Sequence, residues 1–267
     1  MGGISVAVPD HGSILTANPA GIALLKGSGV SASYRFLSLD RRHSTINFTH
    51  SLASGAGFGL GWISAGVRDI EGRDLNGQRT GAITDNENAF LFAFSRGAGQ
   101  HIAIGLALTY LNQQLGRASA KGFGLDVGMI GRPLGRWVVG TAAHNLRAKL
   151  SWQTPIEDRS SQTRDELPVR WVLGVAYTVK DALVSGEGEW AEDRRTVFRT
   201  GVSLRIFPSF TVMAGIGRYA EEDGGTIPTF GCAVRQPRNE AFELRYAYSN
   251  DAIEAGGGHV VTVVVGW

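Results

Sequence analysis

Residues 169–179 read Val-Arg-Trp-Val-Leu-Gly-Val-Ala-Tyr-Thr-Val, and their side chains alternate between two kinds. Apolar or aromatic residues occupy every odd position from Val169 to Val179, whereas the even positions hold Arg170 and otherwise small or medium side chains. A period of two is typical of a β-strand whose two faces meet different surroundings. Because almost no part of the chain repeats at the helical period, the pattern predicts an all-β fold.

The same alternation recurs in fourteen segments of the chain. Most are about 9–12 residues long, as expected for tilted strands that cross a bilayer, and longer than the roughly 5–6 residues usual in soluble sheets. The sequence therefore predicts a 14-stranded antiparallel transmembrane β-barrel, in which every backbone polar group of the wall is paired. The segments are 30–39, 43–53, 56–67, 88–96, 101–112, 121–131, 136–146, 168–179, 182–191, 196–207, 210–219, 227–236, 240–249 and 258–267.

The connections between these segments differ in length at the two ends of the predicted barrel. Turns such as Lys180-Asp181 and Pro208-Ser209 are short, whereas Arg68–Glu87 and Arg147–Leu167 are polar stretches of about twenty residues, which we expect to be loops. Short turns at one rim and long loops at the other are typical of transmembrane barrels. An even number of strands places both termini of the chain at the short-turn rim.

Aromatic residues fall at both ends of the predicted strands. Two aromatic belts are typical of a barrel wall at the two membrane interfaces, although the same rings could form the core of a soluble β-protein. The chain ends on Trp267, and a final aromatic residue resembles the assembly signal of outer-membrane barrels. The belt residues are Tyr110, Trp171, Trp190 and Tyr248 at the long-loop end, and Trp137, Tyr177 and Trp267 at the short-turn end.

Composition argues against several classes of protein. The chain has 26 basic and 24 acidic residues, a balance that gives no electrostatic reason to expect nucleic acid as a partner. A single cysteine excludes a disulfide framework and a thiolate metal site. The uncharged run Gly97–Gly116 has an apolar core too short for a membrane-spanning helix. The first residues do not form a signal peptide, so we expect that peptide to have been removed or to be absent from this chain.

No constellation of residues predicts catalysis. The six histidines are scattered, and no G-x-S-x-G motif is present. The glycine clusters at 55–61 and 122–126 lie within predicted strands with no following helix, so they do not fit a nucleotide-binding loop. They predict strands that line a crowded lumen or bend. We therefore expect no enzyme activity, no cofactor and no metal.

Charged residues collect on the face that strand parity turns inward. Opposite signs are mixed there, so their simplest role is to form ion pairs across the lumen, and a permeation path is the alternative. Glu187 and Glu189 lie on one arm of a predicted hairpin and Arg199 lies on the other, close enough to pair. The predicted lumen-facing charges are Asp126, Arg170, Glu187, Glu189, Arg199, Arg205, Glu243 and Arg245.

The stretch before the first strand resembles a known family. Met1-Gly2-Gly3 followed by Asn18-Pro19-Ala20-Gly21 is similar to the start of PorV/PorQ outer-membrane proteins, which are relatives of the long-chain fatty-acid transporter (FadL) type. The stretches 123–128, 139–140 and 145–146 resemble the central hairpin of that family, and Leu167-Pro168 resembles the opening of its next strand. The resemblance covers essentially the whole chain, and the family's fourteen strands agree with the number counted above.

The resemblance implies two parts of the chain. Residues 1–29 would form a short plug or hatch with its motif at Asn18, Pro19, Ala20 and Gly21, and residues 30–267 would form the barrel. Fourteen strands enclose more room than side chains alone fill, since about eight give an interior that is just filled. A plug of this kind would occupy that room.

The resemblance leaves the function open between three alternatives. PorV-type proteins act in protein secretion, which implies an adaptor with protein partners at the outer rim. FadL-type proteins pass hydrophobic small molecules, which implies a channel with a small apolar ligand. A purely structural barrel of a surface complex is the third alternative. All three imply the outer membrane of a Gram-negative-type cell, contact with membrane lipid, and no nucleic acid.

Overall fold

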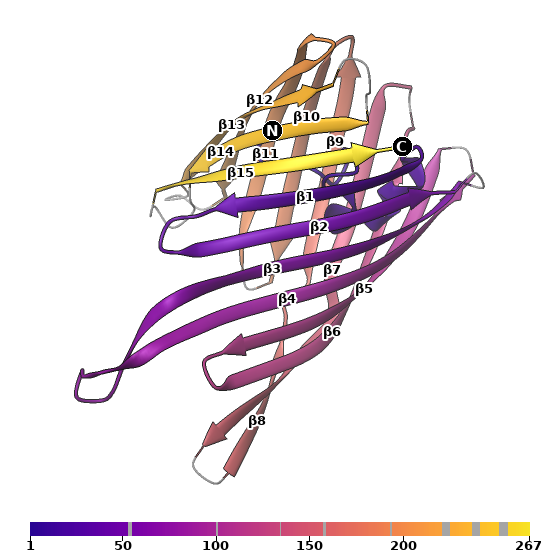
Figure 1. Cartoon of the computed structure of the whole chain (residues 1–267). Helices are drawn as coiled ribbons and strands as arrows, with labels where there is room; N and C mark the ends of the chain where they lie inside the picture. The colour runs from indigo at the N-terminus through magenta and orange to yellow at the C-terminus, as the bar shows by residue number, and fades with distance from the viewer. Residues whose placement is uncertain are drawn as a thin grey trace.

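The computed structural model describes residues 1–267 except 53–54, 100, 134, 157–158, 193, 221–224, 237–240 and 251–255. It is built almost wholly of antiparallel strands around two short helices (Figure 1). The helices are α1 (Ile14–Ala17) and the 3-10 helix η1 (Pro19–Leu24). The strands are β1 (Ser28–Phe36), β2 (Arg41–Ser51), β3 (Ala56–Arg73), β4 (Arg79–Ala98), β5 (Ile102–Leu115), β6 (Ala118–Gly131), β7 (Trp137–Ile156), β8 (Arg159–Glu166), β9 (Arg170–Val179), β10 (Ala182–Ala191), β11 (Arg194–Phe207), β12 (Phe210–Tyr219), β13 (Thr226–Arg235), β14 (Phe242–Asn250) and β15 (Gly257–Gly266).

Fourteen of the described strands close a barrel, which confirms the fold predicted from the alternation. Each strand pairs with its neighbours in sequence, except that β7 pairs with β9 and leaves β8 outside the ring. The ring closes where β1 pairs with β15 in a continuous register from Gly29↔Gly266 to Phe36↔His259. Backbone N–H groups of Ser28 and Trp267 donate to each other's carbonyl oxygens at 2.8 and 2.9 Å. No sheet edge is left in the wall of the barrel.

The two faces of the wall carry different side chains. In β5, Ile104, Leu106 and Leu108 are each about half exposed on the outside, whereas Ala103 and Ala107 between them are buried on the inside. The same alternation makes the outside of the barrel a band of large apolar residues and the inside a lining of small and polar ones. An exposed apolar band that encircles a closed barrel is what a bilayer requires.

The two polar stretches expected as long loops are strands instead. β3 and β4 continue past the apolar band to a tight turn at residues 74–78, and Ile70 still pairs with Ile83 there. β7 likewise extends to Ile156 and pairs with β8. Both hairpins project beyond the other strands in Figure 1. The expectation was wrong for two reasons. In β3 and β4 most residues past Val67 are exposed, so the apolar alternation ends while backbone pairing continues. In β7 the alternation itself continues, with Ala148 and Leu150 buried between the exposed Arg147 and Lys149.

These hairpins define one end of the barrel, called here the hairpin rim, and the opposite end is the turn rim. The strand ends Ser28 and Gly266 lie at the turn rim, as an even strand number requires. The first residue does not: Met1 lies inside the barrel against Gly201 and Gly215 in the middle of β11 and β12. The prediction that both termini lie at the rim is therefore wrong for the amino terminus. No helix in the described ranges is long and apolar enough to cross a membrane.

Aromatic rings mark both edges of the apolar band. Towards the hairpin rim, register places Trp62, Phe90, Tyr110 and Phe123 side by side on neighbouring strands, with 6.3 Å between the Phe90 and Tyr110 rings. Trp171 pairs with Trp190 on another part of the wall. Towards the turn rim, the Trp137 and Tyr177 rings are 4.6 Å apart. This spacing is consistent with two membrane interfaces.

Closure through β15 predicts a strong effect of truncation. Removal of residues 264–267 takes away the pairs at the end of the β1–β15 register and the hydrogen bonds between Ser28 and Trp267. We expect most of the truncated protein to fail to assemble, because an open sheet edge cannot be satisfied in hydrocarbon. The measurement is the fraction of membrane-extracted protein that migrates differently in boiled and unboiled samples on a denaturing gel. Unchanged heat-dependent migration would contradict the expectation.

Candidate functional site

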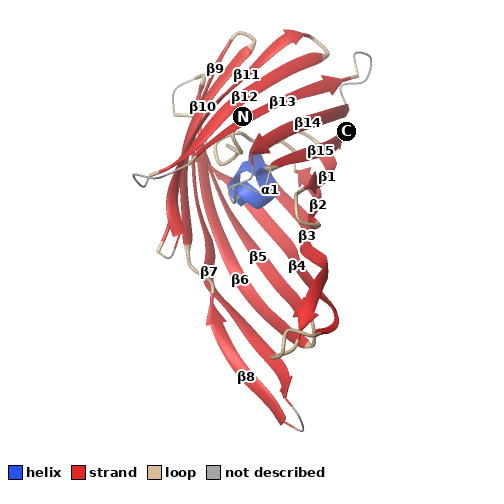
Figure 2. Ribbon diagram, turned by 90° about the vertical axis from the view of Figure 1, so that its left-hand side faces the viewer, coloured by secondary structure: helices blue, strands red, loops and turns tan. Residues whose placement is uncertain are grey.

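The N-terminal segment, residues 1–27, lies inside the lumen. Figure 2 shows α1 enclosed by the strands. Met1 contacts β11 and β12, and η1 packs against β2 to β6, so the segment reaches across the interior. Ile4, Val6 and Ala7 are buried, as are Ile14 and Leu15 of α1 and the first four residues of η1, Pro19–Ile22. The first strand begins at Ser28, two residues before the boundary expected from the sequence.

The Asn18-Pro19-Ala20-Gly21 motif forms the tightest part of this segment. Asn18 is fully buried, and its side-chain oxygen accepts from the Ala20 backbone N–H at 3.1 Å, which caps η1. Its amide nitrogen donates to the carbonyl oxygens of Val6 at 3.0 Å and of Met129 in β6 at 3.1 Å. Pro19 occupies the first helical turn, where its missing N–H costs nothing. Asn18 therefore joins two parts of the segment to the barrel wall.

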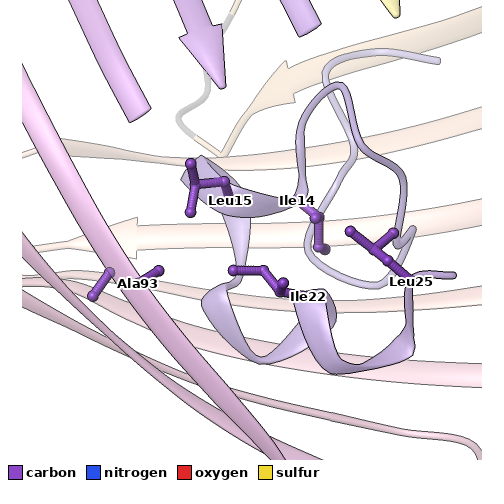
Figure 3. Close-up of a cluster of buried hydrophobic side chains, with 6 residues drawn as sticks. Ile14, Leu15, Ile22, Leu25 and Ala93 are labelled. Atoms are coloured by element: carbon purple, nitrogen blue, oxygen red, sulfur yellow. The ribbon is translucent and has the colours of Figure 1, made fainter. Parts of the chain in front are cut away.

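Apolar side chains of the segment pack against the small residues of the wall. Figure 3 shows Ile14, Leu15, Ile22 and Leu25 gathered near Ala93 of β4. Ile14 and Ile22 have no exposed surface, and Leu15 has 1%. Gly21 lets the two helices approach, because a Cβ there would collide with the Ile14 side chain. The segment thus has its own apolar contact with the wall, and two further apolar clusters join it to the wall, one around Val6 and Val172 and one around Ala20 and Ile130.

Glycines of the wall allow the backbone of the segment to lie directly on the strands. A Cβ on Gly59 would be 2.7 Å from Leu15 Cδ1, and one on Gly105 would be 2.6 Å from Ala20 Cα. Such distances are too short for any real Cβ, so a larger residue at these positions would displace the segment. This contact explains Gly57, Gly59 and Gly61 of the first predicted glycine cluster, whereas Gly122 and Gly124 of the second lie against β7. The wall glycines in such contact are Gly29, Gly57, Gly59, Gly61, Gly105, Gly128, Gly140, Gly174, Gly201 and Gly215.

One cluster of charges binds the segment near the turn rim; it consists of Asp10, Arg235, Glu243 and Arg245. Arg245 Nη1 donates to Asp10 Oδ1 at 2.8 Å, and Arg245 Nε also contacts Glu243. Arg235 Nη2 lies 2.6 Å from Glu243 Oε2. Burial alone would raise the pKa of Asp10, but the Arg245 guanidinium and the hydrogen bond from Ser13 hold it below its usual value. Asp10 is thus kept ionised and paired with the wall.

A second cluster lies nearer the hairpin rim and consists of Arg170, Glu187, Glu189 and Arg199 from β9, β10 and β11. Glu187 Oε2 accepts the backbone N–H groups of Ser5 and Val6, both at 3.0 Å. Arg199 Nη1 lies 3.3 Å from Glu187 Oε1 and 2.7 Å from Glu189 Oε2. Arg170 Nη1 donates to Glu189 at 3.4 Å, while its buried Nε has no hydrogen-bond partner within the described residues. The cluster binds the backbone of the segment through Glu187.

Asp126 stands apart from both clusters and supports an irregular part of the wall. The register between β6 and β7 shifts twice near Leu125, and Asn145 has a positive φ of 62°. Asp126 Oδ1 accepts from the Asn145 backbone N–H at 2.9 Å, and Asp126 Oδ2 lies 3.3 Å from His144 Nδ1. A bulge leaves backbone groups without ladder partners, and this carboxylate satisfies one of them.

The remaining predicted site residues have separate positions. Arg205 lines a cavity near the turn rim. Trp267 follows the last strand at the same rim, and 66% of it is exposed. Sequence reasoning missed Asp10 and Arg235. Arg235 could have been found, because it shares the parity of buried Ala233 and pairs in register with Glu243. Asp10 lies in irregular chain, where no periodicity indicates which way a side chain points.

Two cavities lie on opposite sides of the N-terminal segment. The hairpin-side cavity, of about 530 Å³, is lined by Ser5, Val6 and Thr16 and by the Arg170–Arg199 cluster. The turn-side cavity, of about 430 Å³, is lined by Val8, Pro9 and Asp10 and by the Asp10–Arg245 cluster. The segment therefore lies between a space open towards the hairpin rim and a space open towards the turn rim. In the described part of the chain, no group of His, Cys, Asp and Glu has the arrangement of a metal site.

Comparisons with solved structures show the fold. The chain is similar to the toluene transporter TodX of Pseudomonas putida, with 13% identity, a TM-score of 0.71, and coverage of 99% of this chain and 95% of that one. It is similar to the monoaromatic hydrocarbon channel CymD, with 10% identity, a TM-score of 0.69, and coverage of 99% and 94%. A FadL homologue of Pseudomonas aeruginosa gives 13% identity, a TM-score of 0.68, and coverage of 98% and 95%.

Sequence comparisons add no family. No protein-family model matches the chain, and no curated protein matches it. The similar structures are transporters and channels rather than enzymes, consistent with the expectation that this chain is not an enzyme. None of those named above is described as a PorV or PorQ protein, so that part of the resemblance stays a prediction. The chain has the fold of FadL-like outer-membrane barrels.

The wall glycines give a test of how the segment is held. We expect Gly105→Ala to displace η1, because the new Cβ would meet backbone atoms of Pro19 and Ala20, which cannot rotate away. Overpacking of this kind costs about 1–3 kcal/mol, which corresponds to roughly 5- to 150-fold faster amide hydrogen exchange in residues 14–25. The matched control is Gly217→Ala, where the nearest atoms to the new Cβ are 3.8 Å away. Equal exchange in both variants would contradict the expectation.

Proposed function

We propose that the protein is a channel for small, partly apolar molecules, in which the N-terminal segment is a displaceable hatch. The observation that carries this proposal is the position of residues 1–27 between the two cavities of the lumen. A structural barrel needs no such separation, whereas a channel that must stay closed at rest does. The fold shared with TodX and CymD, described as a toluene transporter and a monoaromatic hydrocarbon channel, supports the same reading.

The contacts of the segment suit a hatch that can move. It is held by noncovalent contacts with glycine and alanine positions and by two ion clusters, and the single cysteine, Cys232, forms no disulfide. The Arg245–Asp10 pair borders the turn-side cavity, with 27% and 25% of the two side chains exposed, so it can exchange partners with water or with a ligand that enters there. The buried apolar cluster around Ile14 and Leu15 holds the closed position in the absence of a ligand.

The lining of the hairpin-side cavity indicates what could enter. Leu37, Ile63, Val172 and Ile227 supply apolar surface, and the Arg170–Arg199 cluster supplies polar groups. Sites for small molecules commonly combine an apolar lining with a few polar groups that fix orientation. We infer a ligand with an apolar body and one polar end in preference to a sugar or an ion.

Removal of the hatch tests this proposal. We expect little steady conductance from the intact protein in a planar bilayer, and a clearly larger one after deletion of residues 2–25, because the two cavities would then join. The Gly105→Ala variant, which keeps every residue of the hatch, should lie between the two. Heat-dependent gel migration shows whether each variant is assembled. Large, steady conductance of the intact protein would contradict the hatch.

A second function, partnership in protein secretion or surface assembly, is favoured by the two projecting hairpins. The β3–β4 hairpin carries the exposed Ile70 and Ile83 and ends at the fully exposed Leu75. β8 pairs only with β7 among the described strands. Together they offer apolar and backbone groups beyond the membrane, where a partner protein could bind.

Gentle purification from the native envelope distinguishes this second function from the first. A secretion or assembly partner should co-purify with the intact barrel and be lost when residues 68–83 and 149–166 are each replaced by a short turn. The barrel without these hairpins keeps its ring, so its heat-dependent migration is the control. Recovery of the barrel alone, with an apolar molecule bound against the N-terminal segment, would contradict partnership and support the channel.

A further inference from the structure

A groove lies on the outer face of the barrel near the hairpin rim, outside the lumen. Strands β1 to β4, side by side in Figure 1, form it, and its volume is about 760 Å³. Tyr34 and Phe36 lie on one side and Trp62 and Asn88 on the other, with Ser44 and Ser64 between them. Arg41, Arg42, Arg68, Asp40 and Asp69 lie at its end towards the rim.

Strand register fixes the depth of this groove relative to the membrane. Trp62 belongs to the aromatic row that marks the edge of the apolar band. The next outward-facing row towards the rim joins Tyr34, Ser44, Ser64 and Asn88 in direct register across the four strands. Aromatic belts lie at the level where hydrocarbon gives way to headgroups. The groove therefore begins at the headgroup level.

Arg42 is the residue that most clearly needs a ligand here. It pairs in register with Phe36 and Gly66 and has the outward parity of the exposed Ile46. Its Nε is buried and has no hydrogen-bond partner within the described residues. A buried donor without a partner costs about 1–3 kcal/mol, so its retention calls for an acceptor that binds from outside.

The other groups of the groove suit a ligand in which a phosphate group is joined to apolar chains. Three arginines face two aspartates, which leaves an excess of positive charge. The Tyr34 and Phe36 rings are 4.6 Å apart, and Trp62 Nε1 donates to Asn88 Oδ1 at 3.0 Å, which holds the indole N–H towards the next row of the groove. Guanidinium groups bind phosphate through paired N–H donors.

We propose that this groove is a binding site for a phosphate-bearing lipid of the outer leaflet. The headgroup phosphate accepts hydrogen bonds from Arg42, and the acyl chains run from the Tyr34 and Trp62 rings down over the apolar wall. The occupant is a lipid because the groove opens directly above the apolar band, where lipid is the surrounding medium. This site is independent of the hatch and of any ligand in the lumen.

Native mass spectrometry of the full-length barrel in mild detergent tests the proposal. The probe is a bisphosphorylated lipid A, with a diacylglycerol as the phosphate-free comparison. We expect lipid A to bind the intact barrel at least ten times more tightly than diacylglycerol, and to bind Arg42→Gln about tenfold more weakly, as loss of a charge-assisted hydrogen bond implies. Inorganic phosphate should not displace the lipid, because it lacks the apolar part.

The matched control is Arg218→Gln. Arg218 is an exposed arginine near the hairpin-rim end of β12, four strands from β1 along the ring. Its replacement should leave lipid A binding unchanged, and heat-dependent migration should show both variants assembled. Equal binding by Arg42→Gln and the intact protein would overturn the proposal, as would equal weakening in both variants. Displacement by inorganic phosphate would instead identify a site for the free anion and would overturn the lipid assignment.

Discussion

The pairing of β1 with β15 is the interaction on which the rest of the molecule depends. A sheet in hydrocarbon has no water to satisfy its edges, so every strand of the wall needs two neighbours. The continuous register from Gly29 to Phe36 joins β1 to β15 and so completes the ring of strands. The reciprocal hydrogen bonds between Ser28 and Trp267 lie at the turn-rim end of this register. Closure separates the outer face of the wall, which must be apolar because it meets lipid, from the inner face, which can carry polar groups.

Closure of fourteen strands also creates a space that must be filled. Larger residues on the strands could have filled it, but the wall has glycine and alanine there, and the first 27 residues of the chain occupy the room. The fit depends on absent Cβ atoms at positions such as Gly105 and Gly140 and on the buried Asn18. It also depends on two polar contacts with the wall: Glu187 accepts from the Val6 backbone, and Arg245 donates to Asp10. These are reversible contacts, which is why we regard the segment as a hatch and not as a fixed core.

The lumen and the outer wall present different chemistry to different molecules. Inside, opposite charges are mixed, so the lumen has paired polar groups around patches of apolar surface instead of a ring of one sign. Outside, Arg42 lies in register with the uncharged Phe36, Gly66 and Asn86 of the neighbouring strands. The lumen lining fits the passage of a partly apolar solute, and the outer groove at Arg42 fits a lipid that remains bound.

The sequence by itself determined the class of fold, because a period of two depends only on which residues face lipid and which face the lumen. It therefore indicated the strand number and the inward side of Glu187 and Arg199, whereas attention to Asn18-Pro19-Ala20-Gly21 came only from the resemblance to a known family. It missed the strands beyond Val67, where most side chains are exposed and the alternation ends while pairing continues, and it missed the strand beyond Leu146, although Ala148 and Leu150 keep the alternation there. Only the tertiary structure decided which glycines contact the hatch, that Asp10 meets Arg245, and that Arg42 Nε has no hydrogen-bond partner among the described residues. Those contacts join residues far apart in the chain, and no local pattern records them.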